Sequence, residues 1–434
     1  MTPKTRRLQR IQTLAVTFLV MAGLVNYLDR STLSIANRSI AHELNLSATQ
    51  MGLLLSAFSL AYAFSQLPVG AMLDRFGARM MLGLGMFAWS CAQIAGGLVT
   101  TFQQFFIARI FLGIGEAPQF PAGAKVISEW FNARERGGPT GIFTASSTIA
   151  PMLAPPLLTF LMLGFGWRIM FIVMGAVGVA VSIGWYLIYR NREERQMEPE
   201  ELRHLSEGEE GHADNAKVSF AEWRGLFAKR TTWGMILGFM GVIYMFWLYL
   251  TWLPAYLEHE RHLSIAKTGW LVSIPYAFGT LGVCISGFLA DWLVRKGMAP
   301  VNSRKWPICV GLFGAAAFTV PAAFTPSTSL AIAYICGAMF FVNLASGGAW
   351  ALVSVAAPRR LVASLGSMQN FGGYLGGSLA PLITGVVVDR TQSFVVALLI
   401  SAAVAVVAAL IYLFLVSSPI SSRELNSSSA QEAF

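Results

Sequence analysis

Charged residues are scarce in this chain: Asp, Glu, Lys and Arg make up 12% of its 434 residues, against about 25% in an average soluble domain. Hydrophobic residues reach 55%. This balance argues against a disordered chain and against a soluble enzyme. The net charge of +9 would suit nucleic acid, but the charges lie between long apolar runs, as in the loops of membrane proteins. We therefore expect a chain that contacts the lipid bilayer and binds no nucleic acid.

Cysteine and histidine are also rare, with four and five residues. The cysteines lie inside apolar runs at irregular separations, and none has CxxC spacing, so neither a metal site nor a disulfide framework is indicated. No nucleophile–base set or glycine-rich phosphate loop is found. The sequence predicts no enzyme, no metal and no cofactor.

Twelve apolar stretches are long enough to cross a bilayer, since a spanning helix needs about 20 mostly apolar residues. The first contains two charges and is followed by no small-residue cleavage site, so we expect an uncleaved membrane helix. The sequence thus predicts an all-α membrane protein with twelve transmembrane helices. The predicted spans are 11–36, 49–71, 80–99, 104–127, 140–164, 168–189, 232–257, 267–290, 306–325, 328–351, 363–388 and 393–416.

The basic residues between these spans are distributed unevenly. If the N-terminus is cytoplasmic, the segments on the outside hold only Arg38, Arg168, Arg261, Lys267 and Arg390. Cytoplasmic loops carry the excess of Lys and Arg, so both termini are predicted to lie in the cytoplasm.

One long polar stretch divides six spans from six spans. It covers 191–230, is rich in Glu and Arg, and is predicted to be a solvated cytoplasmic linker. The expected organisation is an N-terminal six-helix bundle (1–190), this linker, a C-terminal six-helix bundle (231–417) and a serine-rich, disordered tail (418–434).

Similar features recur at nearly half the chain length. The second span is followed by GAMLDRFGAR, with Gly70, Asp74, Arg75 and Arg79, and the eighth by GFLADWLVRKG, with Asp291 and Arg295. The fifth and eleventh spans share LAP motifs, and basic pairs precede both. Three matches in register indicate parallel structural repeats with a substrate path between them.

The loop GxxxDRxGxR resembles the signature of the major facilitator superfamily, whose transporters rock two six-helix bundles around a central site. The resemblance covers essentially the whole chain. It implies a cytoplasmic latch made by Gly70, Asp74, Arg75 and Arg79 with the second copy, Asp291 and Arg295. We expect Gly70 to allow close helix packing and the charged residues to form charge-assisted pairs.

Four charges lie well inside the predicted spans of the first half, namely Asp29, Arg30, Arg109 and Glu116, whereas Lys125 and Arg168 lie at span edges. A charge at the bilayer centre costs roughly 2.5–3.5 kcal/mol on insertion scales, so such residues are functional candidates. Burial favours the protonated carboxylic acid, and a nearby arginine opposes this. An anion competing for that arginine would favour protonation, which is a route to proton–anion symport. The alternative is that these residues form structural ion pairs, and that Arg30 is bound permanently to an acid of the fourth span.

A sharper resemblance is carried by NYLDRSTLSIA, GIGEAPQFPAGAKVISEWFNARERG and YLTWLPAYL. These strings are similar to the anion:cation symporter family, and closest to bacterial importers of galactonate, glucarate, galactarate or hexuronates. The resemblance implies proton coupling at Asp29 and Glu116, with Arg109 nearby. It places the substrate carboxylate on Arg30, beside Tyr27.

The same resemblance implies that Tyr62, Trp350 and Asn370 line the cavity, together with Ser147 on the fifth span. Galactonate-type relatives carry an amide at the position aligned with Ser147, and the tenth-span serine is shifted to Ser346. Both departures leave the substrate within the family open.

The sequence therefore predicts a proton-coupled symporter that imports an organic anion by alternating access in a bacterial inner membrane. Among organic anions, the sequence favours a sugar acid (a hexonate, hexuronate or aldarate). We expect a monomer with protons as the coupling ion. Three alternatives remain open. They are an importer of aromatic or dicarboxylic acids, a proton-driven exporter of small molecules, and a transporter-like sensor.

Overall fold

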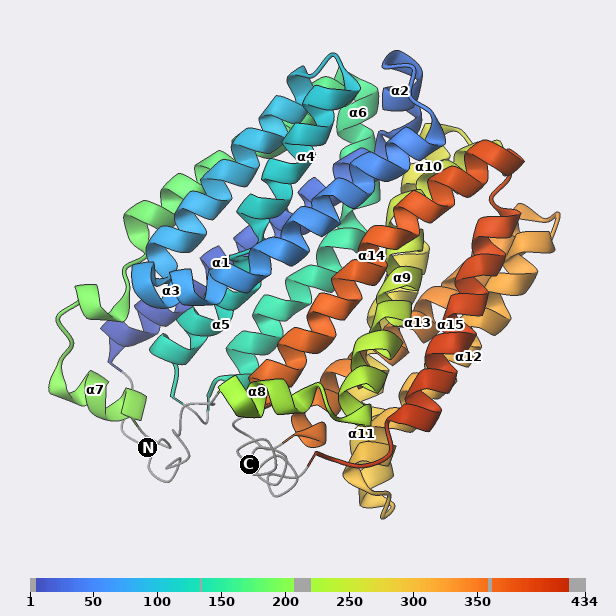
Figure 1. Cartoon of the computed structure of the whole chain (residues 1–434). Coiled ribbons are helices and arrows are strands. Elements are labelled where there is room, and N and C mark those ends of the chain that lie inside the picture. Colours follow the sequence, from blue (N-terminus) through green and yellow to red (C-terminus); the bar gives the residue numbers. More distant parts are fainter. Residues whose placement is uncertain (1–4, 133–134, 207–219, 358–360, 421–434) are drawn as a thin grey trace. The chain divides into compact units, whose positions relative to one another are not determined.

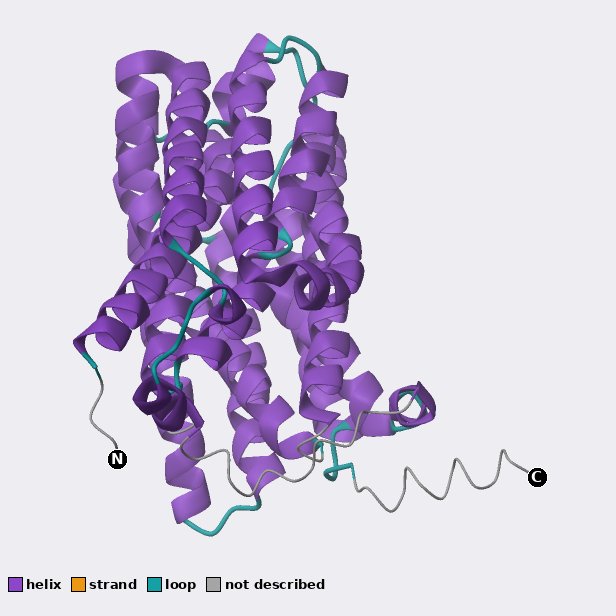
Figure 2. Ribbon diagram, turned by 90° about the vertical axis from the view of Figure 1, so that its left-hand side faces the viewer, coloured by secondary structure: helices purple, strands orange, loops and turns teal. Residues whose placement is uncertain are grey.

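The computed structural model describes residues 5–132, 135–206, 220–357 and 361–420. In these ranges the regular structure is helical and no strand occurs (Figures 1 and 2). The first half contains α1 (Arg6–Ile35), α2 (Asn37–Glu43), α3 (Ala48–Leu98), α4 (Phe102–Glu116), α5 (Gln119–Trp130), α6 (Gly137–Ile188), η1 (Arg192–Glu194) and α7 (Pro199–Ser206). The second half contains α8 (Phe220–Leu226), α9 (Arg230–His259), α10 (Ile265–Leu271), α11 (Ser273–Arg295), α12 (Pro300–Phe324), α13 (Thr328–Ala356), α14 (Val362–Thr391) and α15 (Val395–Leu415).

The predicted spans lie in helices, which confirms the all-helical membrane architecture. Ten helical segments of the described chain are long and apolar enough to cross a membrane. One of these, α6, has 52 residues and breaks at Gly166, where φ is 83°. The number of crossings and the side on which the termini lie remain predictions, and most of the predicted tail, 421–434, lies outside the described residues.

Prolines and a glycine explain where the helices break. Spans 104–127 and 267–290 were expected to be continuous, but the first is divided into α4 and α5 and the second into α10 and α11. Pro118 and Pro275 lie at these breaks, and a proline lacks the N–H and clashes with the carbonyl four residues earlier. Gly77 breaks α3 with φ of 75°, a left-handed backbone that glycine adopts readily.

The chain divides into two compact units. The first comprises Met1–Leu46 and Ala57–Ala213, and the second comprises Ser47–Ser56 and Asp214–Phe434. The start of α3 therefore belongs to the second unit.

Part of the predicted linker packs on the first unit. The Thr5 hydroxyl donates to Glu201 on α7 at 2.9 Å. On the same helix, His204 is buried and lies 3.3 Å from the carboxylate of Glu135. The linker is thus partly helical and docked.

In the first unit, Glu43 on α2 is bound by two residues of α6 that directly follow the break at Gly166. The Trp167 indole N–H donates to one oxygen of Glu43 at 2.5 Å, and Arg168 donates to the other at 3.0 Å. These bonds, that of Trp167 first, lower the pKa of Glu43 below its usual value. Arg168 also donates to the Val99 carbonyl at 2.6 Å, so it ties α2 and the end of α3 to α6.

In the second unit, carboxylates cap two helices. Asp389 on α14 accepts bonds from the backbone N–H groups of Ala48 and Thr49, at 2.8 and 2.7 Å. Glu260 accepts from the backbone N–H of Phe394, just before α15, at 2.6 Å. The first N–H groups of a helix lack intrahelical partners and carry a partial positive charge, so carboxylates stabilise these ends.

Large apolar side chains point outward on both units. Phe160, Phe288 and Leu187 are 70%, 75% and 64% exposed. Soluble proteins rarely expose contiguous apolar surface of this kind, whereas a helix that faces lipid does so at no cost. The outer surface of the helices therefore agrees with a multi-pass membrane protein.

Candidate functional site

The four intramembrane charges of the first half meet inside the first unit. Asp29 and Arg30 come from α1, and Arg109 and Glu116 from α4. All are buried, with 0% to 4% of their surface exposed. The Arg30 Nε donates to the Glu116 carboxylate at 2.7 Å. Buried charges are costly unless they are paired, and this pair compensates two of the four.

Three aromatic rings surround the Arg30 guanidinium. Its central carbon lies 4.8 Å from the ring centre of Tyr27 and 4.9 Å from those of Phe58 and Tyr62. Arg109 lies 5.2 Å from the Phe58 ring as well. Cations are attracted to aromatic faces within about 6 Å. The predicted substrate residues Tyr27, Arg30 and Tyr62 are therefore brought together, and Phe58 is an addition that the sequence did not single out.

Asp29 has no hydrogen-bond partner for either carboxylate oxygen among the described residues, although it is completely buried. Its electrostatic neighbours are Glu116 and Arg109, and the Trp89 side chain also interacts with it, outside good hydrogen-bond geometry. Two nitrogens of Arg109 also lack hydrogen-bond partners within the described chain. The cluster thus keeps unused hydrogen-bonding capacity in its interior, which is expensive in a purely structural ion-pair network.

A second polar layer supports the cluster from α3. Gln93 donates to the hydroxyl of Thr32 at 2.9 Å, and this hydroxyl donates to the Asp29 carbonyl at 2.7 Å. Gln93 was not among the predicted residues, although an amide inside the apolar run 80–99 was an available signal.

The approach of α4 to α3 depends on a small residue beside Glu116. A Cβ atom added to Gly115 would lie 2.7 Å from the backbone nitrogen of Trp89 and 2.9 Å from its Cβ. The glycine therefore allows α4 to contact α3 closely beside Glu116.

The remaining predicted substrate residues are Ser147 in the first unit and Trp350 and Asn370 in the second. Ser147 is half-buried on α6, and its hydroxyl donates to the Thr144 carbonyl of the same helix at 2.7 Å. Trp350 on α13 is 49% exposed and packs edge-on against Phe239, with ring centres 5.7 Å apart. Asn370 on α14 is half-buried. The second unit is described by itself, so Trp350 and Asn370 remain predictions as partners of Arg30.

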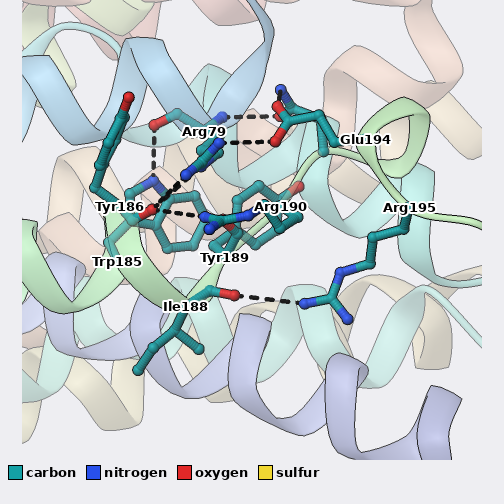
Figure 3. Close-up of polar contacts among 9 residues, drawn as sticks. Arg79, Trp185, Tyr186, Ile188, Tyr189, Arg190, Glu194 and Arg195 are labelled. Carbon is teal, nitrogen blue, oxygen red and sulfur yellow. Dashed lines mark hydrogen bonds and ion pairs between the residues drawn. The ribbon is translucent and has the colours of Figure 1, made fainter.

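The predicted latch residues of the first unit are placed in part. The side chain of Asp74 lies outside the described residues, and Arg75 is exposed. Arg79 donates to Glu194 at 2.8 Å and to the Tyr186 carbonyl at 3.0 and 3.1 Å (Figure 3). A Cβ atom added to Gly70 would meet nothing within 4 Å among the described residues, so its role in close packing stays a prediction.

The second copy of the motif forms a weak contact. Asp291 is 71% exposed at its side chain and lies 3.8 Å from the guanidinium of Arg304 on α12. Arg295 is exposed at the end of α11. The proposed latch between the two bundles therefore stays a prediction.

Comparisons with known proteins agree with this picture. The family model of the Major Facilitator Superfamily matches residues 19–381. The chain is 50% identical over 419 residues to a probable L-galactonate transporter of Escherichia coli (strain K12), covering 96% of this chain and 92% of that protein. It is 30% identical over 402 residues to a hexuronate transporter of Bacillus subtilis (strain 168), covering 91% and 92%. Among solved structures, a bacterial homolog of the human lysosomal transporter Spinster, inward-facing and unoccupied, matches with a TM-score of 0.80 at 18% identity, covering 98% and 99%. The last likeness shows the fold alone.

Proposed function

Because this chain belongs to the Major Facilitator Superfamily of transporters and is not an enzyme, we propose that it imports a sugar acid together with protons. The substrate class follows the names of its relatives, which are transporters of galactonate, galactarate or D-glucarate, and hexuronate. All three groups of substrates combine a carboxylate with several hydroxyls. The site must therefore bind at least one carboxylate and several hydroxyl groups.

The buried pair of Arg30 and Glu116 carries the proposal. A guanidinium is planar and can bind a carboxylate through two parallel N–H bonds. In this structure Glu116 occupies one edge of the guanidinium, at 2.7 Å from Nε, while aromatic rings surround it. A substrate carboxylate of the same charge can compete for the same donors.

Protonation of Glu116 is the coupling step in this proposal. A proton on Glu116 removes the negative charge that holds Arg30, and the guanidinium then accepts the substrate carboxylate. One proton and one carboxylate enter together, so the buried charge of this pair is unchanged. Asp29, with no hydrogen-bond partner for its carboxylate among the described residues, is the second proton carrier, and Arg109 balances its charge when the proton leaves.

The remaining steps follow from alternating access. Tyr62, Asn370 and Trp350 would contact the hydroxyls, and the loaded carrier would rock from outward-open to inward-open. Inside, loss of the proton restores the Arg30–Glu116 pair and expels the anion. We propose that the protein works as a monomer in a bacterial inner membrane, with both termini in the cytoplasm.

Uptake into proteoliposomes tests this function. A panel of radiolabelled hexonates, hexuronates and aldarates, with an aromatic acid and a dicarboxylic acid for comparison, is presented with and without an inward proton gradient. We expect one sugar acid to accumulate only with the gradient and to leak out when a proton ionophore is added. Accumulation of the aromatic or dicarboxylic acid alone would reject the sugar-acid assignment. Accumulation without any gradient would reject proton coupling.

A further inference from the structure

Three arginines gather at the C-terminal end of α6 (Figure 3). Besides Arg79, Arg190 donates to the carbonyls of Tyr186 and Tyr189 at 2.9 and 3.1 Å. Arg195 donates to the Ile188 carbonyl at 3.4 Å. The last carbonyls of a helix lack intrahelical partners and carry a partial negative charge, so these bonds cap the helix.

Capping does not neutralise this positive charge. Arg79 has a carboxylate partner, whereas Arg190 and Arg195 have no carboxylate within 4 Å among the described residues. Arg195 has an Nε atom that is inaccessible and unpartnered in the described structure. Its pKa is lowered by burial and then by the neighbouring charges of Arg7 and Arg190, and the charge of Glu201 opposes this only in part. Like charges held this close attract an anion.

An apolar pocket adjoins the two unneutralised arginines. It is a shallow cleft between the start of α1 and the end of α6, and its apolar wall includes Ile11, Leu14, Phe18 and Ile188. Arg190 and Arg195 line the same pocket. Ile188 is the last residue of α6, so the pocket lies where the spanning helix leaves the hydrocarbon region. The basic side chains are therefore placed at the depth of lipid headgroups.

We propose that this pocket binds an anionic phospholipid, with the headgroup phosphate on Arg190 and Arg195 and an acyl chain along Leu14 and Phe18. Basic pockets between membrane helices on the cytoplasmic side bind anionic headgroups, and the distribution of Lys and Arg predicts that this end of α6 is cytoplasmic. A soluble anion would use the arginines but gain nothing from the apolar wall. The bound lipid would fasten α1, which carries Asp29 and Arg30, to α6.

Thermal unfolding and native mass spectrometry of the purified, delipidated protein test this site. The probes are phosphatidylglycerol, phosphatidylcholine and glycerol 3-phosphate. We expect phosphatidylglycerol to raise the midpoint of unfolding and to remain bound after collisional activation, with little effect of the other two. The double variant Arg190→Gln/Arg195→Gln should lose at least half of both signals. Leu14→Trp, which fills the pocket and keeps the charges, should also lower lipid retention.

A charge-matched control is Arg230→Gln/Lys296→Gln, which removes two exposed basic residues from the second unit. It should bind phosphatidylglycerol as the wild type does. Three results would overturn the proposal: full lipid retention by both pocket variants, equal stabilisation by glycerol 3-phosphate, or an equal loss in the control. The first result would show that no lipid binds in this pocket. The second would show that the arginines bind a free anion, and the third that any basic surface residue has the same effect.

Discussion

The substitution Arg30→Lys separates the charge of this residue from its planar shape. Lysine keeps the positive charge that Glu116 requires, so the buried ion pair at 2.7 Å can persist. It cannot offer the two parallel donors that a carboxylate binds. We therefore expect the variant to fold normally and to bind the substrate weakly.

The magnitude follows from the number of bonds lost. A bidentate contact reduced to a single one loses one hydrogen bond to a charged group, which is worth about 1.5–3 kcal/mol. The dissociation constant should then rise roughly 10- to 150-fold. The rings of Tyr27, Phe58 and Tyr62 lie 4.8 to 4.9 Å from the guanidinium. They would orient a flexible ammonium less well, so we expect the dissociation constant to rise by an amount in the upper part of this range.

Isothermal titration calorimetry with two ligands measures the effect. One ligand is the transported sugar acid, and the other is the matching alditol, in which a CH₂OH group replaces the carboxylate. Affinity for the acid should fall as stated, and the weak affinity for the alditol should be unchanged. Arg168→Lys, outside the buried cluster, is the matched control. If Arg30→Lys binds the acid within about threefold of wild type, below the loss of even one charged hydrogen bond, Arg30 does not hold the carboxylate.

Three further predictions concern stability, measured as the midpoint of thermal unfolding in detergent. Gly115→Ala should destabilise the protein by about 1–3 kcal/mol through overpacking, and it should also slow transport. Gly164→Ala, with open space around its Cβ position, should do neither. Equal stability of the two variants would refute the close contact at Gly115. Asp389→Ala should cost about 0.5–2 kcal/mol by removing a helix cap, while Asp291→Ala should be nearly neutral, and the reverse order would contradict the structure. The lowered pKa of Glu43 means that its stabilisation is present above the unfolded-state pKa and is lost as the pH falls through the folded value. Glu43→Gln should therefore lower the midpoint at pH 7 and reduce the loss between pH 7 and pH 4, and an unchanged acid profile would exclude this contribution.

Much of the fold is predictable because a bilayer demands long apolar helices. The runs around 232–257 and 393–416 coincide closely with α9 and α15. Hydropathy does not show where a helix breaks inside an apolar run. The breaks at Pro118 and Pro275 follow from local backbone geometry, and prolines such as Pro155 inside α6 are tolerated without one. The packing of surrounding helices decides between these outcomes.

The site was predictable as a set of residues but not as a set of contacts. A charged residue inside an apolar run is easily recognised in the sequence. The candidates Asp29, Arg30, Arg109 and Glu116 could therefore be predicted without a structure. Helical periodicity shows which residues share a face of one helix, but not how two helices are rotated against each other. For that reason the sequence left open whether Arg30 pairs with Glu116. Gln93 was missed because a single amide in an apolar run is also compatible with helix packing.

The central claim is that buried carboxylates of the first unit carry the coupled protons. Proton uptake measured with a pH-sensitive dye in proteoliposomes, on addition of the sugar acid, tests it most directly. Wild type should take up protons with the substrate. Glu116→Gln mimics the protonated acid, so it should bind the sugar acid and exchange it, and it should move fewer protons per substrate than the wild type, since only Asp29 can still carry one. Glu258→Gln, a buried carboxylate of the second unit, should behave as wild type. Proton uptake by Glu116→Gln at the wild-type ratio to substrate would contradict the account.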